Sequence, residues 1–274
     1  MFRTIVGRAV ASAAGLQFCA TAICLSDKEL SKKPKWYQKD VLELETSLKT
    51  LGRRGFTDSP TVLSEAFDTL KKFSDFSNVE VQWRLARACV EKSVFSKCVK
   101  EKTNLLHEAV EYAKKAFALD LDNHCAGAHK CKGVFKHAIF MYAIALSMLQ
   151  DIDKKADRTA DIIKHFELAS EIDSNDAYTC HLLGVVHYRK KNYEEALSLF
   201  EKAEKIKEKF SVRNLYYMGL TLQDTGKTKE AIRSYIAAYK LRPSSEYDIM
   251  ARSQAKAKLL KLNVSKEEYE EGKY

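Results

Sequence analysis

Apolar residues along this chain have the spacing that is typical of amphipathic helices. In addition, small and aromatic residues recur at a fixed distance along the sequence. The distance is 35 residues between the stretch that begins at Ala177 and the stretch that begins at Val212. The corresponding positions are Gly184 and Gly219, Ala196 and Ala231, Phe200 and Tyr235, and Ala203 and Ala238. One period earlier, Phe166 and Ala169 precede Phe200 and Ala203 by 34 residues. Self-similarity at this period predicts repeated pairs of helices.

The period and the residue types resemble those of the tetratricopeptide repeat, a helix–turn–helix unit. In this interpretation Gly184 and Ala196 are small because two antiparallel helices approach closely there, and an aromatic residue fills the space between neighbouring pairs. Gly226 is expected at the tight turn between two helices. Pro243 follows the second helix of its repeat, where it prevents the helix from continuing.

Upstream of these repeats the pattern is looser. The apolar spacing predicts helices over residues 36–49, 63–76, 79–93, 105–123, 126–150 and 157–172. The first is an amphipathic helix ended by Gly52 and Gly55, and the second is expected to be the lone second helix of a pair. A turn stretched by about ten residues is expected around Ser96 to Thr103.

We therefore predict an all-α fold, an α-solenoid of tetratricopeptide-like helix pairs in a right-handed superhelix. The predicted organisation is a basic tail or targeting segment (1–26), a leading amphipathic helix and linker (27–58), the helical repeat domain (59–262) and a charged, frayed C-terminal tail (263–274).

The composition agrees with a helical protein, because 274 residues contain only 10 glycines and 3 prolines. A hydrophobic fraction of 46% with 30% charged residues argues against a disordered chain and against a polytopic membrane protein. Lysine and arginine number 46 against 37 acidic residues, a net charge of +9 that favours an acidic partner.

The seven cysteines are scattered through helical sequence without a CxxC pair, and we interpret them as reduced packing residues. The N-terminal segment leaves three interpretations open. Residues 1–26 carry Arg3 and Arg8 but no acidic residue, and an uncharged run of 17 residues follows from Ala9 to Leu25. The segment is a weakly structured tail, a mitochondrial signal or anchor, or a secretory signal, and cleavage of a signal after Ala22 would leave six cysteines. The run is too short and too weakly apolar for a membrane span, so none is expected.

Several runs of residues resemble the regulator of microtubule dynamics family. They are WRLARA at 83–88, EAVEYAKKAFALD at 108–120, AHKCKG at 128–133 and HFELASEIDSNDAYTCHLLGV at 165–185. Cys131 departs from the aromatic residue that the family has at this place, and the insertion usual after the fourth run is absent. The resemblance covers roughly Leu63 to Leu260. It implies a non-enzymatic, microtubule-associated helical-repeat protein acting at spindles, with some members at mitochondria.

In tetratricopeptide repeats the first helices line a groove, and fixed positions of each repeat face it. The positions that the repeat register places there are mainly basic or aromatic, and an acidic peptide, such as a tubulin tail, or a lipid phosphate would suit them. They are Arg84, Lys92, Lys130, His137, Tyr178, His181, Tyr188, Arg189, Arg213 and Tyr216. A solvated helical face in a generally basic protein is the alternative.

No sequence motif organises a catalytic site or a nucleotide site, and we expect neither an enzyme nor a cofactor. His124, Cys125, His129, Cys131 and His137 resemble metal ligands, but only Cys125 and His129 lie one helical turn apart, too few for a closed site. No nucleic-acid recognition module is present.

Two functions remain as hypotheses. The first is a scaffold in the cytoplasm, at the cytoskeleton and spindle, that binds microtubules. The second is a lipid-binding or lipid-transfer module tethered at mitochondria by residues 1–26.

Overall fold

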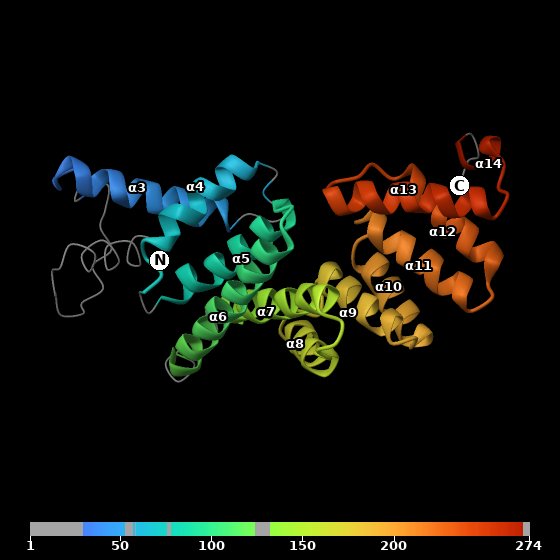
Figure 1. Cartoon of the computed structure of the whole chain (residues 1–274), viewed down its shortest axis with the longest axis horizontal. Helices are drawn as coiled ribbons and strands as arrows, with labels where there is room; N and C mark the ends of the chain where they lie inside the picture. Colours follow the sequence, from blue (N-terminus) through green and yellow to red (C-terminus); the bar gives the residue numbers. More distant parts are fainter. Residues whose placement is uncertain (1–29, 53–56, 58, 76–77, 124–131, 271–274) are drawn as a thin grey trace. The chain divides into compact units, whose positions relative to one another are not determined.

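A computed structural model describes residues 30–52, 57, 59–75, 78–123 and 132–270 of the chain. All regular structure in these residues is helical, without a strand (Figure 1). The helices group into two compact units, one ending at His165 and the other beginning at Phe166, so that the boundary falls inside a helix. The boundary lies within the repeat domain expected for residues 59–262.

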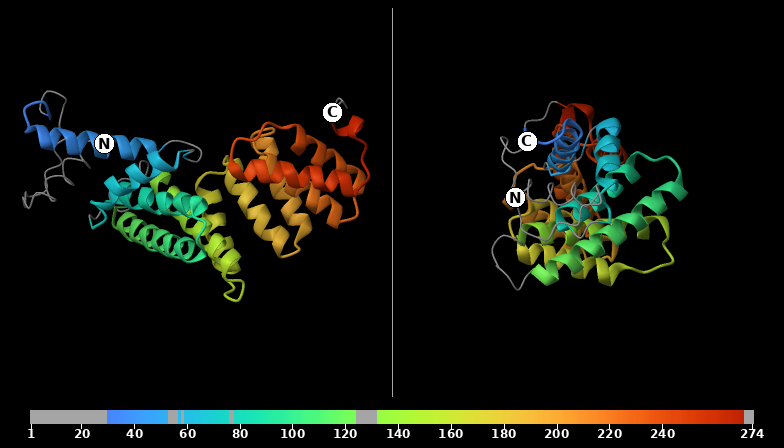
Figure 2. Two further views of the ribbon diagram at one scale, coloured as in Figure 1. Left: turned by 45° about the horizontal axis from the view of Figure 1, so that its top comes forward. Right: turned by 90° about the vertical axis from the view of Figure 1, so that its left-hand side faces the viewer.

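The first unit begins with α3 (Lys35–Thr50) and α4 (Pro60–Lys71), which pack against each other. They are followed by α5 (Val79–Phe95), α6 (Val99–Asn123) and α7 (Lys132–Ile152). Helices α5 and α6 lie side by side in Figure 1 and again in Figure 2. The expected lone second helix thus has α3 as its partner, so the leading helix belongs to the first helix pair.

The second unit contains most of the regular repeats. After α8 (Thr159–Ile172), which holds the boundary, come α9 (Ala177–Arg189), α10 (Tyr193–Ile206), α11 (Val212–Asp224) and α12 (Thr228–Lys240). Helices α13 (Glu246–Lys261) and α14 (Lys266–Glu270) complete it. The pairs α9–α10 and α11–α12 pack tightly, and α11 also contacts α13, as first helices of neighbouring repeats do. The predicted fold of helix pairs is confirmed.

The helix starts recur with the repeat. Asp176, Ser211 and Ser245 each accept a backbone N–H bond in the first turn of α9, α11 and α13. These residues are 35 and 34 positions apart, so the caps keep the period of the core. Side-chain acceptors at this position satisfy N–H groups that have no partner inside the helix.

The glycine–aromatic contacts take the form that the repeat predicted. A Cβ atom added to Gly184 would lie 2.6 Å from the Phe200 ring, and one added to Gly219 would lie 2.5 Å from the Tyr235 ring. Both aromatic side chains are fully buried. The absence of a side chain therefore lets each helix pair close around a large ring.

Two local predictions were wrong. The turn after α5 is short, because α6 begins at Val99 rather than after Thr103. The C-terminal tail is not frayed throughout, since Tyr269 of α14 is 3% exposed and its ring packs edge-on against Tyr239, with centroids 5.3 Å apart. An aromatic residue in a charged segment was the signal for this contact.

Candidate partner-binding site

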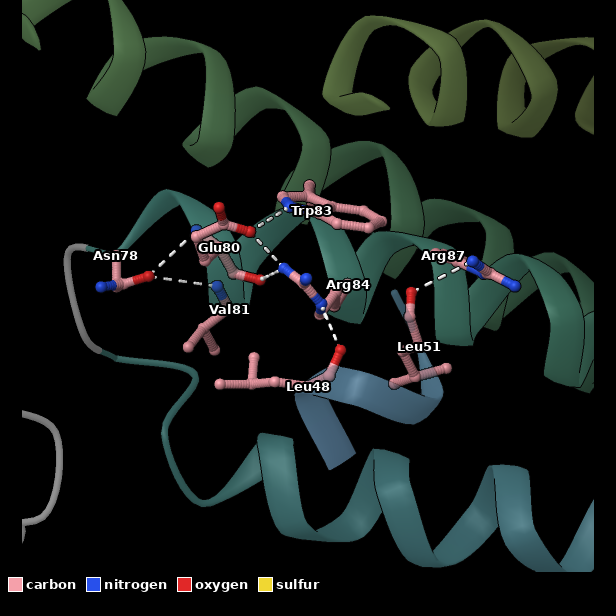
Figure 3. Close-up of polar contacts among 8 residues, drawn as sticks. All are labelled: Leu48, Leu51, Asn78, Glu80, Val81, Trp83, Arg84 and Arg87. Atoms are coloured by element: carbon pink, nitrogen blue, oxygen red, sulfur yellow. Dashed lines mark hydrogen bonds and ion pairs between the residues drawn. The ribbon is translucent and has the colours of Figure 1, made fainter. Parts of the chain in front are cut away.

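Arg84 lies in the interior of the first unit instead of facing a groove. Its Nε donates to the Leu48 carbonyl at 2.7 Å, and its Nη1 donates to the Glu80 carbonyl at 3.0 Å and also pairs with the Glu80 carboxylate (Figure 3). The guanidinium carbon lies 4.2 Å from the Trp83 ring centroid. Burial lowers the pKa of Arg84, and the Glu80 charge opposes this effect.

Arg87 repeats this arrangement one turn later on α5. Its Nη1 donates to the Leu51 carbonyl at 3.1 Å and its Nε donates to Glu91 at 2.6 Å. The other oxygen of Glu91 accepts the backbone N–H of Thr57 at 3.1 Å. Leu48 and Leu51 lie at the C-terminal end of α3, where carbonyl groups lack helical partners and attract cations. The two arginines of the WRLARA run therefore hold α3 against α5 through hydrogen bonds to the end of α3 (Figure 3).

The other predicted residues of the first unit are spread over its surface. Lys92 is half-buried, and its Nζ lies 4.6 Å from the Phe67 ring centroid and 3.4 Å from Ser64 Oγ. His137 is exposed and stacks on Trp83 with centroids 4.7 Å apart. Lys130 lies outside the described residues, as do His124, Cys125, His129 and Cys131 of the candidate metal ligands.

In the second unit the predicted positions divide into an interior group and a surface group. His181 is fully buried, and Tyr216 is 9% exposed in the core cluster. The expectation that these two side chains face a groove was wrong, because neighbouring helices cover them. Asn214 and Tyr217 of α11 contact His181, and Tyr235 of α12 contacts Tyr216. Tyr178 and Tyr188 are half-buried and Arg189 is exposed. Burial raises the pKa of Tyr178 to about 12.

His181 is a polar group held inside an aromatic cluster. Its Nδ1 lies 3.1 Å from Asn214 Oδ1, and Asn214 Nδ2 donates to the Phe200 carbonyl and to Glu204. The amide oxygen therefore accepts, and His181 carries its proton on Nδ1. Within the described residues Nε2 has no hydrogen-bond partner. Burial, with the charge of Arg213 as a smaller cause, lowers the pKa of His181 to about 3.

The accessible part of this region is a tyrosine–arginine surface formed by Tyr188, Arg213, Tyr217 and Tyr247. Tyr188 and Tyr217 meet edge-on with ring centroids 5.6 Å apart. The Arg213 guanidinium lies 5.7 Å from the Tyr217 centroid and 5.2 Å from the Tyr247 centroid. All four side chains are half-buried, and they come from α9, α11 and α13.

The repeat register identified Tyr188 and Arg213 but missed Tyr217 and Tyr247. Tyr217 lies one helical turn after Arg213, and Tyr247 follows Arg213 by 34 residues, so it occupies the same place in the next repeat. Both spacings were available in the sequence. Extending the register to α13 would have found Tyr247.

The described residues contain no cluster of three or more metal-ligating side chains. None of their helices is long and apolar enough to cross a membrane. Of the cysteines in this part of the chain, Cys89 and Cys180 are buried and Cys98 is exposed, all as free thiols. Burial raises the pKa of the Cys89 thiol to about 12, so it is not a reactive thiolate.

The glycine–aromatic contacts and the recurring caps define a tetratricopeptide-like helical-repeat protein. The solved structure of MamA residues 41 to the end from Desulfovibrio magneticus RS-1 has this fold, with a TM-score of 0.51 and 15% identity. The match covers 74% of this chain and 94% of that chain. A TPR repeat-containing protein of Methanocaldococcus jannaschii is 33% identical over 112 residues, 41% of this chain and 29% of that protein.

The chain belongs to the regulator of microtubule dynamics protein 1-3 family, whose model matches residues 54–192 and 189–263. Regulator of microtubule dynamics protein 1 of Pongo abelii is 32% identical over 179 residues, which cover 57% of this chain and 53% of that protein. The Homo sapiens protein of the same name is 33% identical over 163 residues, which cover 51% of this chain and 48% of that protein. The matches thus span about half the length of these relatives.

Proposed function

We propose that this protein is a non-catalytic regulator of microtubule dynamics that binds the microtubule through its helical repeats. Membership of the family is the observation that carries the proposal. The net charge of +9 supports it, because tubulin presents an acidic surface. The tyrosine–arginine surface offers an aromatic and cationic contact of the kind that acidic peptides bind.

Within this proposal the protein acts at the cytoskeleton, including the spindle, and contributes to chromosome segregation there. Residues 1–26 lie outside the described part of the chain, and their role in targeting stays a prediction. Imaging a fluorescent fusion with and without residues 1–26 tests it. A mitochondrial signal that disappears on deletion would show that these residues direct the protein to that organelle.

Co-sedimentation with polymerised tubulin tests the proposed function. We expect the purified protein to pellet with microtubules at low salt, less so at high salt, and less with microtubules whose acidic tails have been removed by protease. Tubulin-free centrifugation controls for self-association. Absence of pelleting at low salt would refute the proposal.

A further inference from the structure

The guanidinium of Arg213 is placed differently from that of Arg252, the other half-buried arginine among the described residues of the second unit. Its backbone N–H donates to Ser211 Oγ and to Asp248 Oδ1, both at 3.1 Å. Its side chain makes no hydrogen bond or ion pair with any residue that the structure describes, and its cation lies over the rings of Tyr217 and Tyr247. Within the described residues, none of its nitrogen atoms is both buried and without a partner, so its side-chain nitrogen atoms keep some contact with solvent.

Arg252 on α13 shows what an arginine with a structural role looks like here. Its cation lies 5.2 Å from the Tyr239 ring, as Arg213 lies over its own tyrosines, but its Nε donates to the Tyr239 carbonyl at 2.7 Å. Lys258 similarly reaches Gln223 at 3.4 Å. Arg213 is therefore oriented by aromatic rings while its hydrogen-bonding edge stays unused.

The carboxylate of Asp248 on α13, which binds the Arg213 backbone, already has its donors. Asp248 is 3% exposed, and its Oδ1 accepts from the Ser211 hydroxyl at 2.9 Å and from the Arg213 backbone. Its Oδ2 accepts from the Ser244 N–H at 3.1 Å and from the Ser244 hydroxyl at 2.7 Å. With four donors bound, both oxygens of the Asp248 carboxylate have partners other than the guanidinium.

These charges select the kind of anion. A guanidinium presents two parallel N–H donors that match a carboxylate. A phosphate group would bring close to two negative charges beside Asp248, whereas a side-chain carboxylate brings one, which the Arg213 charge balances. The flanking tyrosines cover the rest of an extended peptide better than a strongly hydrated headgroup.

We propose that Arg213, held between Tyr217 and Tyr247, is the anchor that binds a glutamate or aspartate side chain of an acidic peptide. This deepens the proposed function by naming the contact through which the repeats take an acidic chain, and it rests on that function only for the choice of tubulin as the source of the peptide. Tyr217 and Tyr247 are positioning residues, since they orient the guanidinium.

The test measures binding of a fluorescein-labelled oligoglutamate peptide by anisotropy at low salt, with oligoglutamine as the uncharged probe. We expect Arg213→Gln to weaken oligoglutamate binding by about ten- to a hundred-fold, since a hydrogen-bonded charge pair is lost. Arg213→Lys keeps the positive charge but loses the two parallel N–H donors of the guanidinium, so it should retain only part of the affinity. The matched control is Arg233→Gln, which removes the same charge from an exposed position on α12 and should change the affinity less than about three-fold.

Equal weakening by Arg233→Gln and Arg213→Gln would overturn the proposal, because it would show a general charge effect. So would an Arg213→Gln protein that is folded by circular dichroism and binds oligoglutamate like the parent. Binding of phosphatidic acid vesicles that depends on Arg213, without binding of oligoglutamate, would assign the surface to lipid and refute the peptide.

Microtubule pelleting separates this inference from the proposed function. If the protein binds oligoglutamate through Arg213 but does not pellet with microtubules, the proposed function is refuted. The role of Arg213 as a peptide anchor would then still stand. If Arg213→Gln pellets with microtubules as the parent does and also binds oligoglutamate as the parent does, Arg213 is not the anchor. The proposed microtubule function would then still stand.

Discussion

Two turns of the second unit have the same backbone conformation but different residues. Gly226 ends α11 with a φ of 81°, and Lys191, 35 residues earlier, ends α9 with a φ of 63°. In both turns the following residue donates back into the helix, Lys227 to Leu222 at 2.8 Å and Asn192 to His187 at 3.0 Å. This left-handed conformation is favourable for glycine and strained for lysine.

We therefore expect Lys191→Gly to stabilise the protein by about 0.5–1 kcal/mol, the relief of left-handed strain minus the entropy of a more flexible unfolded chain. The matched control is Lys190→Gly, which removes the same charge at a residue with a φ of −76° and should be neutral or destabilising. Urea denaturation of the three proteins gives the comparison. A Lys191→Gly protein no more stable than its parent would contradict the strain.

Gly184 lies where α9 packs against α10, and the Phe200 ring leaves no room there for a larger residue. Gly184→Ala would place a Cβ 2.6 Å from the buried Phe200 ring. We expect a net loss of about 1–2 kcal/mol, because overpacking outweighs the better helix propensity of alanine. A double-mutant cycle with Phe200→Leu should show a coupling above about 0.5 kcal/mol, whereas a cycle with Tyr235→Leu in the next pair should be nearly additive. Equal coupling in both cycles would argue against a local clash.

At the scale of elements, the arginines of the WRLARA run decide how α3 packs. Each binds a carbonyl near the C-terminal end of α3 (Figure 3). Each also pairs with a carboxylate on its own helix, Glu80 for Arg84 and Glu91 for Arg87. The apolar pattern predicted both α3 and α5, but it gave no reason for two arginines on a buried face. The reason is visible only when the end of α3 is next to them.

We expect Arg84→Met to destabilise the first unit by about 3–5 kcal/mol, because Glu80 and the Leu48 carbonyl would lose a buried partner. Amide hydrogen exchange should show faster exchange in the last turns of α3. Lys92→Met is the control, since it removes a half-buried cation on the same helix whose contacts are long, and we expect a loss below about 1 kcal/mol. Unchanged amide hydrogen exchange rates in α3 after Arg84→Met would rule out that Arg84 holds α3 against α5.

On the scale of the whole molecule, one buried histidine makes stability depend on pH. The pKa of His181 is about 3 in the folded protein against about 6.5 in an unfolded chain, so the unfolded state binds more protons between these values. Stability is therefore full above pH 6.5 and falls as the pH decreases toward 3. Between pH 7 and pH 5 the expected loss is about 2 kcal/mol.

Urea denaturation at several pH values tests this dependence. His181→Gln has no proton to bind in this range, so its stability should fall less steeply between pH 7 and pH 5 than that of the parent. His107→Gln, at an exposed position on α6, should leave the slope unchanged. Parallel curves for the parent and His181→Gln would contradict a buried neutral imidazole.

The sequence by itself determined the class of fold and the family. Repeats of 34 to 35 residues, small residues opposite aromatic ones and Gly226 at its turn are local properties, and a regular solenoid is built from contacts between neighbours in sequence. The same register pointed to Arg213 and Tyr188, which the structure places on one surface.

Only the tertiary structure decided which polar side chains are free. The repeat register assigned both Arg84 and Arg213 to the groove. Arg84 binds the Leu48 carbonyl at the end of α3, whereas the Arg213 side chain makes no hydrogen bond with a described residue. His181 and Tyr216 occupied groove positions in the register but are buried in the core. Periodicity assigns a residue to one side of a helix, whereas its exposure and its partners depend on which neighbouring element covers that side.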